Sequence, residues 1–93
     1  MASRKIGNEK MIRVLFFAGF RELAGTDNLE IEDGSLKNIR ELVEKLAEIL
    51  PAELIEALKD ETAMVSIDHK YAGWEGKLHQ DAEVGFLPPV SGG

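Results

Sequence analysis

The residues best suited to chemistry lie at the end of this 93-residue chain, in the stretch FLPPVSGG from Phe86 to Gly93. Glycine has no side chain, so Gly92 and Gly93 form a thin strand that can enter a narrow active-site channel. Pro88 and Pro89 hold the approach to them in an extended form. The pattern predicts a tail that leaves the domain and is handled by another protein.

The reactive group of this tail is the terminal carboxylate of Gly93. A carboxylate is a poor electrophile at neutral pH and needs activation, most simply by attack on ATP to give an acyl-adenylate. A nucleophile then displaces AMP, and a nucleophile that delivers sulfur leaves a C-terminal thiocarboxylate. The chain has no cysteine, which excludes disulfides, thiolate nucleophiles and cysteine-based zinc sites of its own.

The overall charge is acidic, with a formal net charge of −6 and a pI of about 4.9. An acidic surface repels phosphate backbones, so we expect no nucleic-acid partner and favour a protein partner with a basic face. No segment approaches the ~20 apolar residues that a membrane span needs, and the N-terminus lacks the apolar stretch of a signal peptide. We therefore expect a soluble, cytoplasmic protein that makes no membrane contact.

The chain that precedes the tail alternates between strand and helix patterns. Strands are predicted where β-branched and aromatic residues occur with period two. The expected strands cover 12–18, 29–32, 63–68 and 83–88, with a short one around Tyr71 to Trp74. Residues 19–28, GFRELAGTDN, contain two glycines and are expected to form a turn or loop. Across it, the first two strands can pair as a hairpin.

A long helix is predicted between the second and third strands. Apolar residues recur at i, i+3, i+4 and i+7 across 36–50. Ser35 can cap the N-terminus by accepting a hydrogen bond from the N–H of Asn38, and Pro51 ends the helix. Residues 52–59, AELIEALK, predict a short second helical turn.

This order of elements predicts an α+β fold of the β-grasp, ubiquitin-like kind. A mixed sheet of four to five strands would carry one main helix on one face. The domain would cover residues 11–93, preceded by a flexible N-terminal extension of residues 1–10.

The other face of such a sheet has no helix to cover it. Side chains alternate between the two faces of a strand, so Leu15 and Phe17 should share the open face with Arg13. Leu87 should share it with Glu83 in the last strand. An exposed apolar group of this kind is typical of an interface. The alternative is that loops or the N-terminal extension cover these residues.

Two stretches, MIRVLFFAGFRELAGTD at 11–27 and DAEVGFLPPVSGG at 81–93, resemble the small, sulfur-carrying subunits of molybdopterin synthases. The resemblance covers residues 11–93. These subunits share their fold and their Gly-Gly ending with the thiazole-pathway sulfur carriers, which usually lack the Pro-Pro pair.

The resemblance implies a role in the biosynthesis of the molybdenum or tungsten cofactor. In this family a ubiquitin-activating-like enzyme uses ATP to adenylate the terminal glycine, which then becomes a thiocarboxylate with sulfur from a donor protein. The tail enters the large synthase subunit and gives its sulfur to a pterin precursor. The chain would thus be a co-substrate, with no catalytic activity and no bound cofactor.

The resemblance also assigns roles to residues of this chain. Gly93 would be the adenylated and sulfurated residue, with Gly92 beside it. The partner-binding surface would include Phe17, Leu87 and Tyr71, in addition to Leu15 from the face assignment. Arg21 matches an arginine that the family uses near the activating enzyme.

Other interpretations remain open at this point. A ubiquitin-like modifier joined through Gly93 to target lysines needs the same fold and tail, and a passive interaction domain needs only the fold. His69 and His79, with Asp68 and Asp81 nearby, could form a metal site. Their spacing matches no metal-binding motif, however, and solvated loop histidines explain them better, so we predict no metal.

Overall fold

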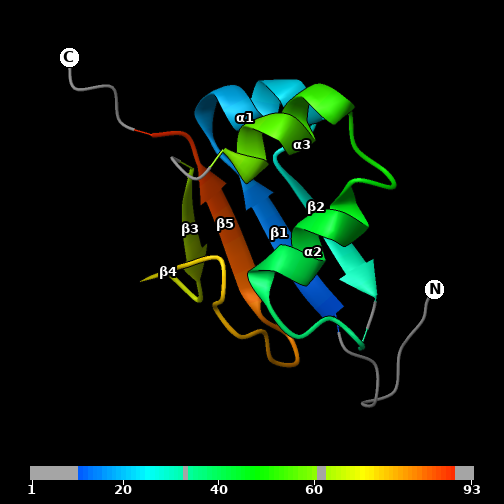
Figure 1. Ribbon diagram of the computed structural model, residues 1–93, viewed down its shortest axis with the longest axis vertical. Helices are drawn as coiled ribbons and strands as arrows, with labels where there is room; N and C mark the ends of the chain where they lie inside the picture. The colour runs from blue at the N-terminus through cyan, green and yellow to red at the C-terminus, as the bar shows by residue number, and fades with distance from the viewer. Residues whose placement is uncertain (1–10, 33, 61–62, 90–93) are drawn as a thin grey trace.

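The computed structural model describes residues 11–32, 34–60 and 63–89. Its elements are β1 (Met11–Phe16), α1 (Ala18–Ala24), β2 (Asn28–Glu32), α2 (Ile39–Leu46), α3 (Ala52–Lys59), β3 (Met64–Ile67), β4 (Lys70–Ala72) and β5 (Glu83–Leu87) (Figure 1). The extension predicted at 1–10 and the glycines at 92 and 93 lie outside the described residues.

The strands form one five-stranded mixed sheet in the order β2-β1-β5-β3-β4. The central pair, β1 and β5, is parallel, and the other pairs are antiparallel. This confirms the predicted α+β, β-grasp fold and the pairing of the first two strands. The parallel centre brings the start of the described chain and the last strand side by side, so β5, which runs into Pro88, lies in the middle of the sheet (Figure 1).

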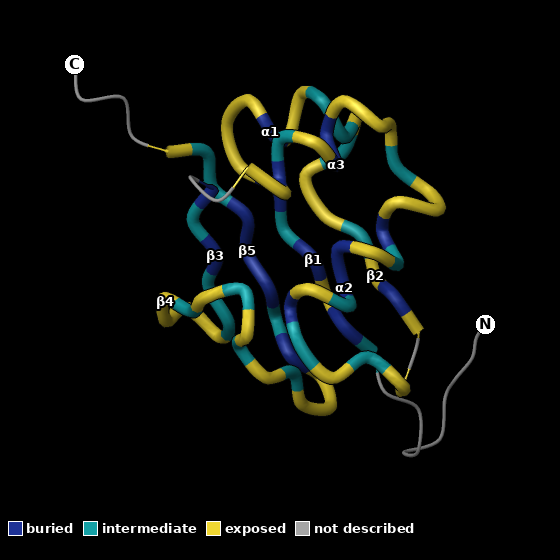
Figure 2. The backbone as a smooth tube through the Cα atoms, in the orientation of Figure 1, coloured by how far each residue is buried: buried dark blue, intermediate teal, exposed yellow. Residues whose placement is uncertain are grey.

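One face of the sheet is covered by helices. Alternate residues of β1 point to this side, and Ile12, Val14 and Phe16 are at most 2% exposed. They join one apolar cluster with buried residues of all three helices, among them Phe20 of α1 and Leu54 of α3. In Figure 2 the buried stretches run mainly along β1 and β5, in the middle of the sheet. The prediction of one main helix was therefore incomplete, because three helices share the covered face in the described part of the chain.

The segment 19–28 was predicted to be a turn or loop, and that prediction was wrong. Ala18–Ala24 form α1, which buries Phe20 against the core. Gly25 ends the helix in the left-handed region at φ 77°, where its N–H donates to the carbonyl of Arg21. Thus the second glycine of the segment is a helix stop, and the strands it separates are joined through a helix instead of a tight hairpin turn.

The start of α2 also differs from the prediction. Asn38, rather than Ser35, is the N-cap: its side-chain oxygen accepts a hydrogen bond from the N–H of Glu41 at 2.9 Å. The carboxylate of Glu41 in turn accepts from the N–H of Lys37 at 2.8 Å. The helix ends at Leu46, short of the predicted 36–50. Ile49, predicted on its apolar side, lies in the following turns and is 56% exposed.

Candidate functional site

The strand registers arrange the open face of the sheet in rows. Beside the β3–β4 turn lies a charged row. In this row Arg13 of β1 stands opposite Glu30 of β2 on one side and opposite Glu83 of β5 on the other. The next row crosses the sheet through Leu15, Gly85, Ser66 and Tyr71. Leu87 of β5 follows beside Met64, and it lines the same hollow as Phe17, the residue directly after β1. The face therefore changes from charged to apolar towards the point where the tail leaves.

Three of the predicted partner-binding residues come together at this apolar end. Phe17, Tyr71 and Leu87 line one hollow of about 250 Å³ with Ser66 and His69. Phe17 is 43% exposed and Tyr71 76%, and Leu87 is half-buried. Phe17 and Leu87 lie on the open face as predicted, and Tyr71 lies there too, although the strand patterns predicted no face for it. None of the described loops covers the two aromatic rings. Their role in partner binding stays a prediction.

The Phe17 ring lies across β5 at Gly85. A Cβ at position 85 would be 3.2 Å from Cε2 of Phe17 and 2.8 Å from the Ser66 hydroxyl oxygen. Real Cβ atoms essentially never come within 2.8 Å of another atom, and 3.2 Å is tighter than most real contacts, so a side chain at this position would displace its neighbours. The glycine inside the last strand is thus explained by close approach of a ring, which is one of the meanings of glycine in a strand.

The two remaining predicted contact residues lie outside this hollow. Leu15 is half-buried on the same face, opposite Gly85, and does not line the hollow. Arg21 is exposed on α1. Sequence reasoning missed Ser66 and His69 as neighbours of the hollow. Period-two alternation in 63–68 could have placed Ser66 on the open face, but the turn that brings in His69 had no recognised signal.

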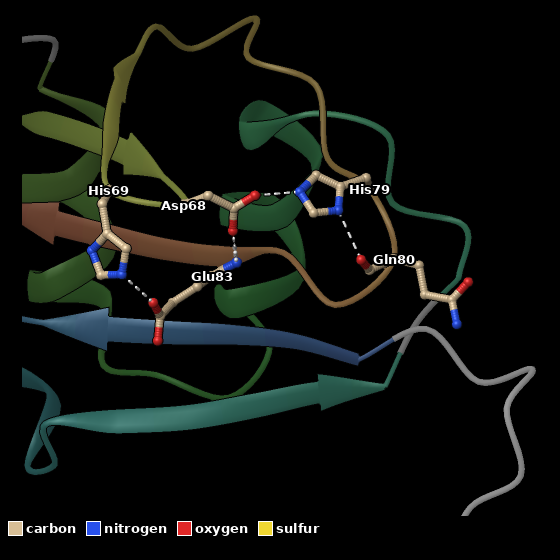
Figure 3. Close-up of polar contacts among 5 residues, drawn as sticks. All are labelled: Asp68, His69, His79, Gln80 and Glu83. Atoms are coloured by element: carbon tan, nitrogen blue, oxygen red, sulfur yellow. Dashed lines mark hydrogen bonds and ion pairs between the residues drawn. The ribbon is translucent and has the colours of Figure 1, made fainter.

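That turn joins β3 and β4 through Asp68 and His69. Ile67 pairs with Lys70, so the loop has two residues, and both have positive φ, 53° and 70°. Such loops favour Asn-Gly or Asp-Gly, because a side chain at positive φ is strained. Asp68 compensates with its carboxylate, which accepts from the N–H of Glu83 at 3.0 Å (Figure 3). The turn is thereby tied to the start of β5.

A second, polar hollow lies at the charged end of the open face. It measures about 530 Å³ and is lined by Met11, Arg13, Glu30, Asp68, His69, Asp81 and Glu83. Arg13 pairs with Glu30 at 3.3 Å, and His69 Nε2 contacts Glu83 Oε1 at 2.9 Å. His69 is the residue common to the polar and the apolar hollow, so the two adjoin there.

Asp68 and His79 form the shortest contact in this region, 2.5 Å between Oδ2 and Nε2. The other ring nitrogen of His79 lies 2.7 Å from the carbonyl oxygen of Gln80 (Figure 3). Both nitrogens thus face acceptors, which only the protonated ring satisfies fully. The contact with Asp68 accordingly raises the pKa of His79, and the hydrogen bonds from His79 and from the Glu83 N–H lower the pKa of Asp68.

The two histidines considered as metal ligands are therefore engaged in separate pairs with carboxylates. Within residues 11–32, 34–60 and 63–89, no three His, Cys, Asp or Glu side chains are grouped as a metal ion would require. In the same part of the chain, none of the helices has the length and apolar character to cross a membrane.

Comparison with known proteins identifies relatives over most of this domain. The profile described as the ThiS family matches residues 14–93. A curated relative from Escherichia coli (strain K12), named molybdopterin synthase sulfur carrier subunit, is 34% identical over 83 residues, which cover 89% of this chain and all of that protein.

Solved structures share the fold. A putative molybdopterin converting factor, subunit 1, from Pyrococcus furiosus is 28% identical with a TM-score of 0.66, covering 87% of this chain and 99% of that one. Small archaeal modifier protein 1 from Methanosarcina acetivorans is 25% identical with a TM-score of 0.73, covering 94% and 100%. A chain from a complex of subunits 1 and 2 of the molybdopterin-converting factor from Helicobacter pylori is 23% identical with a TM-score of 0.60, covering 89% of this chain and 99% of that one. At this identity the similarity supports the fold alone.

Proposed function

The chain belongs to the ThiS family, and from this premise we propose that it is the sulfur carrier of a molybdopterin synthase. Support comes from the curated relative of that name, which this chain matches over the relative's full length. The structural observation that carries the proposal is the position of Leu87. This residue ends β5, lines the apolar hollow and immediately precedes the Pro-Pro-Val-Ser-Gly-Gly tail. A partner that grips the hollow would therefore hold the base of the tail.

The proposed chemistry takes place at Gly93. Its carboxylate oxygen attacks the α-phosphorus of ATP in the active site of an adenylating enzyme, and pyrophosphate leaves. The terminal sulfur of a persulfide on a donor protein then attacks the carbonyl carbon and AMP leaves, which forms an acyl disulfide with the donor. A thiol of the donor or of the adenylating enzyme attacks the donor's sulfur in this disulfide, so a protein disulfide forms and the thiocarboxylate is released. The thiocarboxylate gives its sulfur to a pterin precursor in the large synthase subunit.

In this proposal the catalytic acids and bases belong to the partner enzymes, and this chain supplies none. Phe17, Tyr71 and Leu87 would contact the large subunit, and Arg21 on α1 would contact the adenylating enzyme. ATP would bind to that enzyme, and the chain itself would hold no cofactor. The chain is then a co-substrate and the non-catalytic small subunit of the synthase.

The length of the tail offers a direct test. The reacting carbon must sit at a fixed place in the partner, and one extra residue displaces it by about 3.3–3.6 Å. A misplacement of about 1 Å can reduce a rate about 100-fold. We therefore expect that deletion of Gly93, or addition of one residue after it, abolishes sulfuration of the pterin precursor.

The matched control is Ser91→Ala, which keeps the length of the tail and should keep the activity. Circular dichroism should be unchanged in all variants. The assay is ATP-dependent adenylation by the cognate activating enzyme, followed by pterin sulfuration. Equal sulfuration by a chain that ends at Gly92 would overturn the proposed mechanism.

A second candidate function is a protein modifier conjugated through Gly93 to target lysines. The similarity to small archaeal modifier protein 1 favours it, because that protein shares the fold over its whole length. Intact mass spectrometry of the protein from its native cells distinguishes the two functions. Sulfur in place of one terminal oxygen supports the carrier, and a series of larger lysine-linked conjugates supports the modifier.

A further inference from the structure

We infer that the surface of this chain that docks on the large subunit has two compartments, the apolar hollow and the polar hollow. Apolar groups of the large subunit fill the apolar hollow, and a lysine or arginine side chain of the large subunit enters the polar hollow. This inference rests on the proposed function and adds the chemistry of the partner surface. The hollows adjoin at His69, which lines both. A partner placed over Phe17, Tyr71 and Leu87 therefore reaches the polar hollow by extending past a single side chain.

The charges in the polar hollow select a cation. Four carboxylates, those of Glu30, Asp68, Asp81 and Glu83, face one guanidinium, that of Arg13. Arg13 is already paired with Glu30. Complementary charge across an interface accelerates association and fixes the register of the two surfaces.

Glu83 is the carboxylate best placed to accept this cation. Asp68 is committed within the fold, because one of its oxygens accepts from the Glu83 N–H and the other contacts His79. The contact of Glu83 with His69, by contrast, involves a side chain that is 81% exposed and carries full charge only when protonated. A charge-assisted hydrogen bond from a lysine or arginine is stronger than one from a neutral imidazole. On docking, the partner's cation would take the place of His69 on Glu83.

A protein side chain fits this hollow better than a free metal ion. Its carboxylates come from β2, β5 and the loops before β4 and β5, and no group of three metal-binding side chains is poised among the described residues. The hollow is continuous with an exposed apolar surface, which a metal ion would leave uncovered. A protein partner covers both parts at once.

The experiment titrates the full chain with its cognate large subunit at several salt concentrations, using wild type, Glu83→Gln and Glu56→Gln. Glu56 is exposed on α3, which packs on the covered face, so Glu56→Gln removes the same charge elsewhere. Glu83→Gln should weaken binding about 10-fold and flatten the salt dependence, as expected when one partner of an interfacial charge pair is lost. Glu56→Gln should leave both unchanged.

His69→Gly tests the exchange of partners on Glu83. Glycine tolerates the positive φ at this position, so the turn is preserved. Because His69 also lines the apolar hollow, the informative quantity is the effect of Glu83→Gln measured in the His69→Gly background. That effect should be at least as large as the roughly 10-fold expected in the wild-type background, because Glu83 no longer has a contact with His69 to give up. A clearly smaller effect of Glu83→Gln in the His69→Gly background would overturn the exchange. Unfolding curves of all variants serve as the fold control.

The other outcomes separate the inference from the proposed function. Normal binding by Glu83→Gln, with wild type bound and sulfurated, overturns the polar compartment and leaves the sulfur carrier intact. Failure of the wild type to bind its large subunit overturns both. A concentration-dependent dimer of the wild-type chain that Glu83→Gln dissociates would assign the surface to a second copy, and would overturn the choice of partner.

Discussion

Phe16 and Phe17 are adjacent in the chain, have the same side chain and lie in different environments. Phe16 is 1% exposed and stacks on Phe86, with ring centroids 6.1 Å apart. Phe17 is 43% exposed and borders the apolar hollow on the opposite face. The composition of the pair says nothing about this difference. It follows from the alternation of the strand and from the position of the helices, which cover only one face.

The two faces of the sheet differ in the same way as these two residues. The covered face is built from apolar residues in one cluster, and no polar or charged side chain is buried among the described residues. The open face carries charged residues at one end and exposed aromatic rings at the other. Substitutions on the covered face should therefore act on stability, and those on the open face on binding.

The largest effect on stability is expected for Phe86→Ala. The ring of Phe86 is fully buried in the centre of the sheet, and its removal leaves a cavity beside Phe16. The free energy of unfolding should fall by about 3–5 kcal/mol. Chemical denaturation measures this loss. A loss below about 1 kcal/mol would contradict the description of the covered face as the source of stability.

A much smaller loss of stability, about 1 kcal/mol, is expected for Phe17→Ala, because the ring is already partly in solvent. Binding to the large subunit should weaken by about 10- to 100-fold, as for an aromatic anchor in an interface. Denaturation and a binding titration should be run on the same preparation. Strong destabilisation with unchanged affinity would show that the functions of the two faces had been exchanged.

Ala18 stands at the point where the chain passes from the open-face Phe17 into α1. Its φ is 53°, in the left-handed region that favours glycine. Ala18→Gly relieves this strain and increases the entropy of the unfolded chain, so we expect a net stabilisation of up to about 1 kcal/mol. Ala47→Gly is the matched control, because Ala47 has a right-handed conformation, and it should destabilise. Thermal unfolding measures the change in stability of both variants. Equal destabilisation by the two substitutions would count against strain at Ala18.

The smallest effect concerns the pair of Asp68 and His79. The folded pKa of His79 lies above its usual 6.5, so the contribution of this residue is complete below pH 6.5 and is lost as the pH rises through the folded value. The folded pKa of Asp68 lies below its usual 3.8, so its contribution is present above pH 3.8 and is lost as the pH falls through the folded value.

The pair should therefore stabilise most between these two limits, and modestly, because both side chains are about half exposed. His79→Gln should remove the loss of stability that this pair causes as the pH rises above 6.5. Denaturation curves of wild type and variant across that range measure it. An NMR titration that places the pKa of His79 below 6.5 would exclude the proposed contact.

Much of the fold could be predicted from local patterns. The strands around 63–68 and 83–88 were predicted within two residues of their observed ends, since alternation and residue type agree there. The helix α1 could not be predicted in this way, because Gly19 within it and Gly25 directly after it resemble a loop, and because its stability depends on burying Phe20. Serine is a frequent cap, so the local pattern favours Ser35 as the N-cap of α2, whereas the hydrogen bond from the Glu41 N–H to the Asn38 side chain decides it.

The sequence by itself determined which residues alternate on each strand, and so which of Phe16, Phe17 and Leu87 could share a face. It also determined the composition of the tail and the absence of cysteine. Tertiary structure alone decided that the turn at Asp68 and His69 meets the start of β5, and that His69 lies between the two hollows. Those contacts are made by side chains and join residues that are 11 and 15 positions apart in the chain. They also depend on a two-residue turn at positive φ. No local pattern encodes them, since their geometry exists only after the strands have paired.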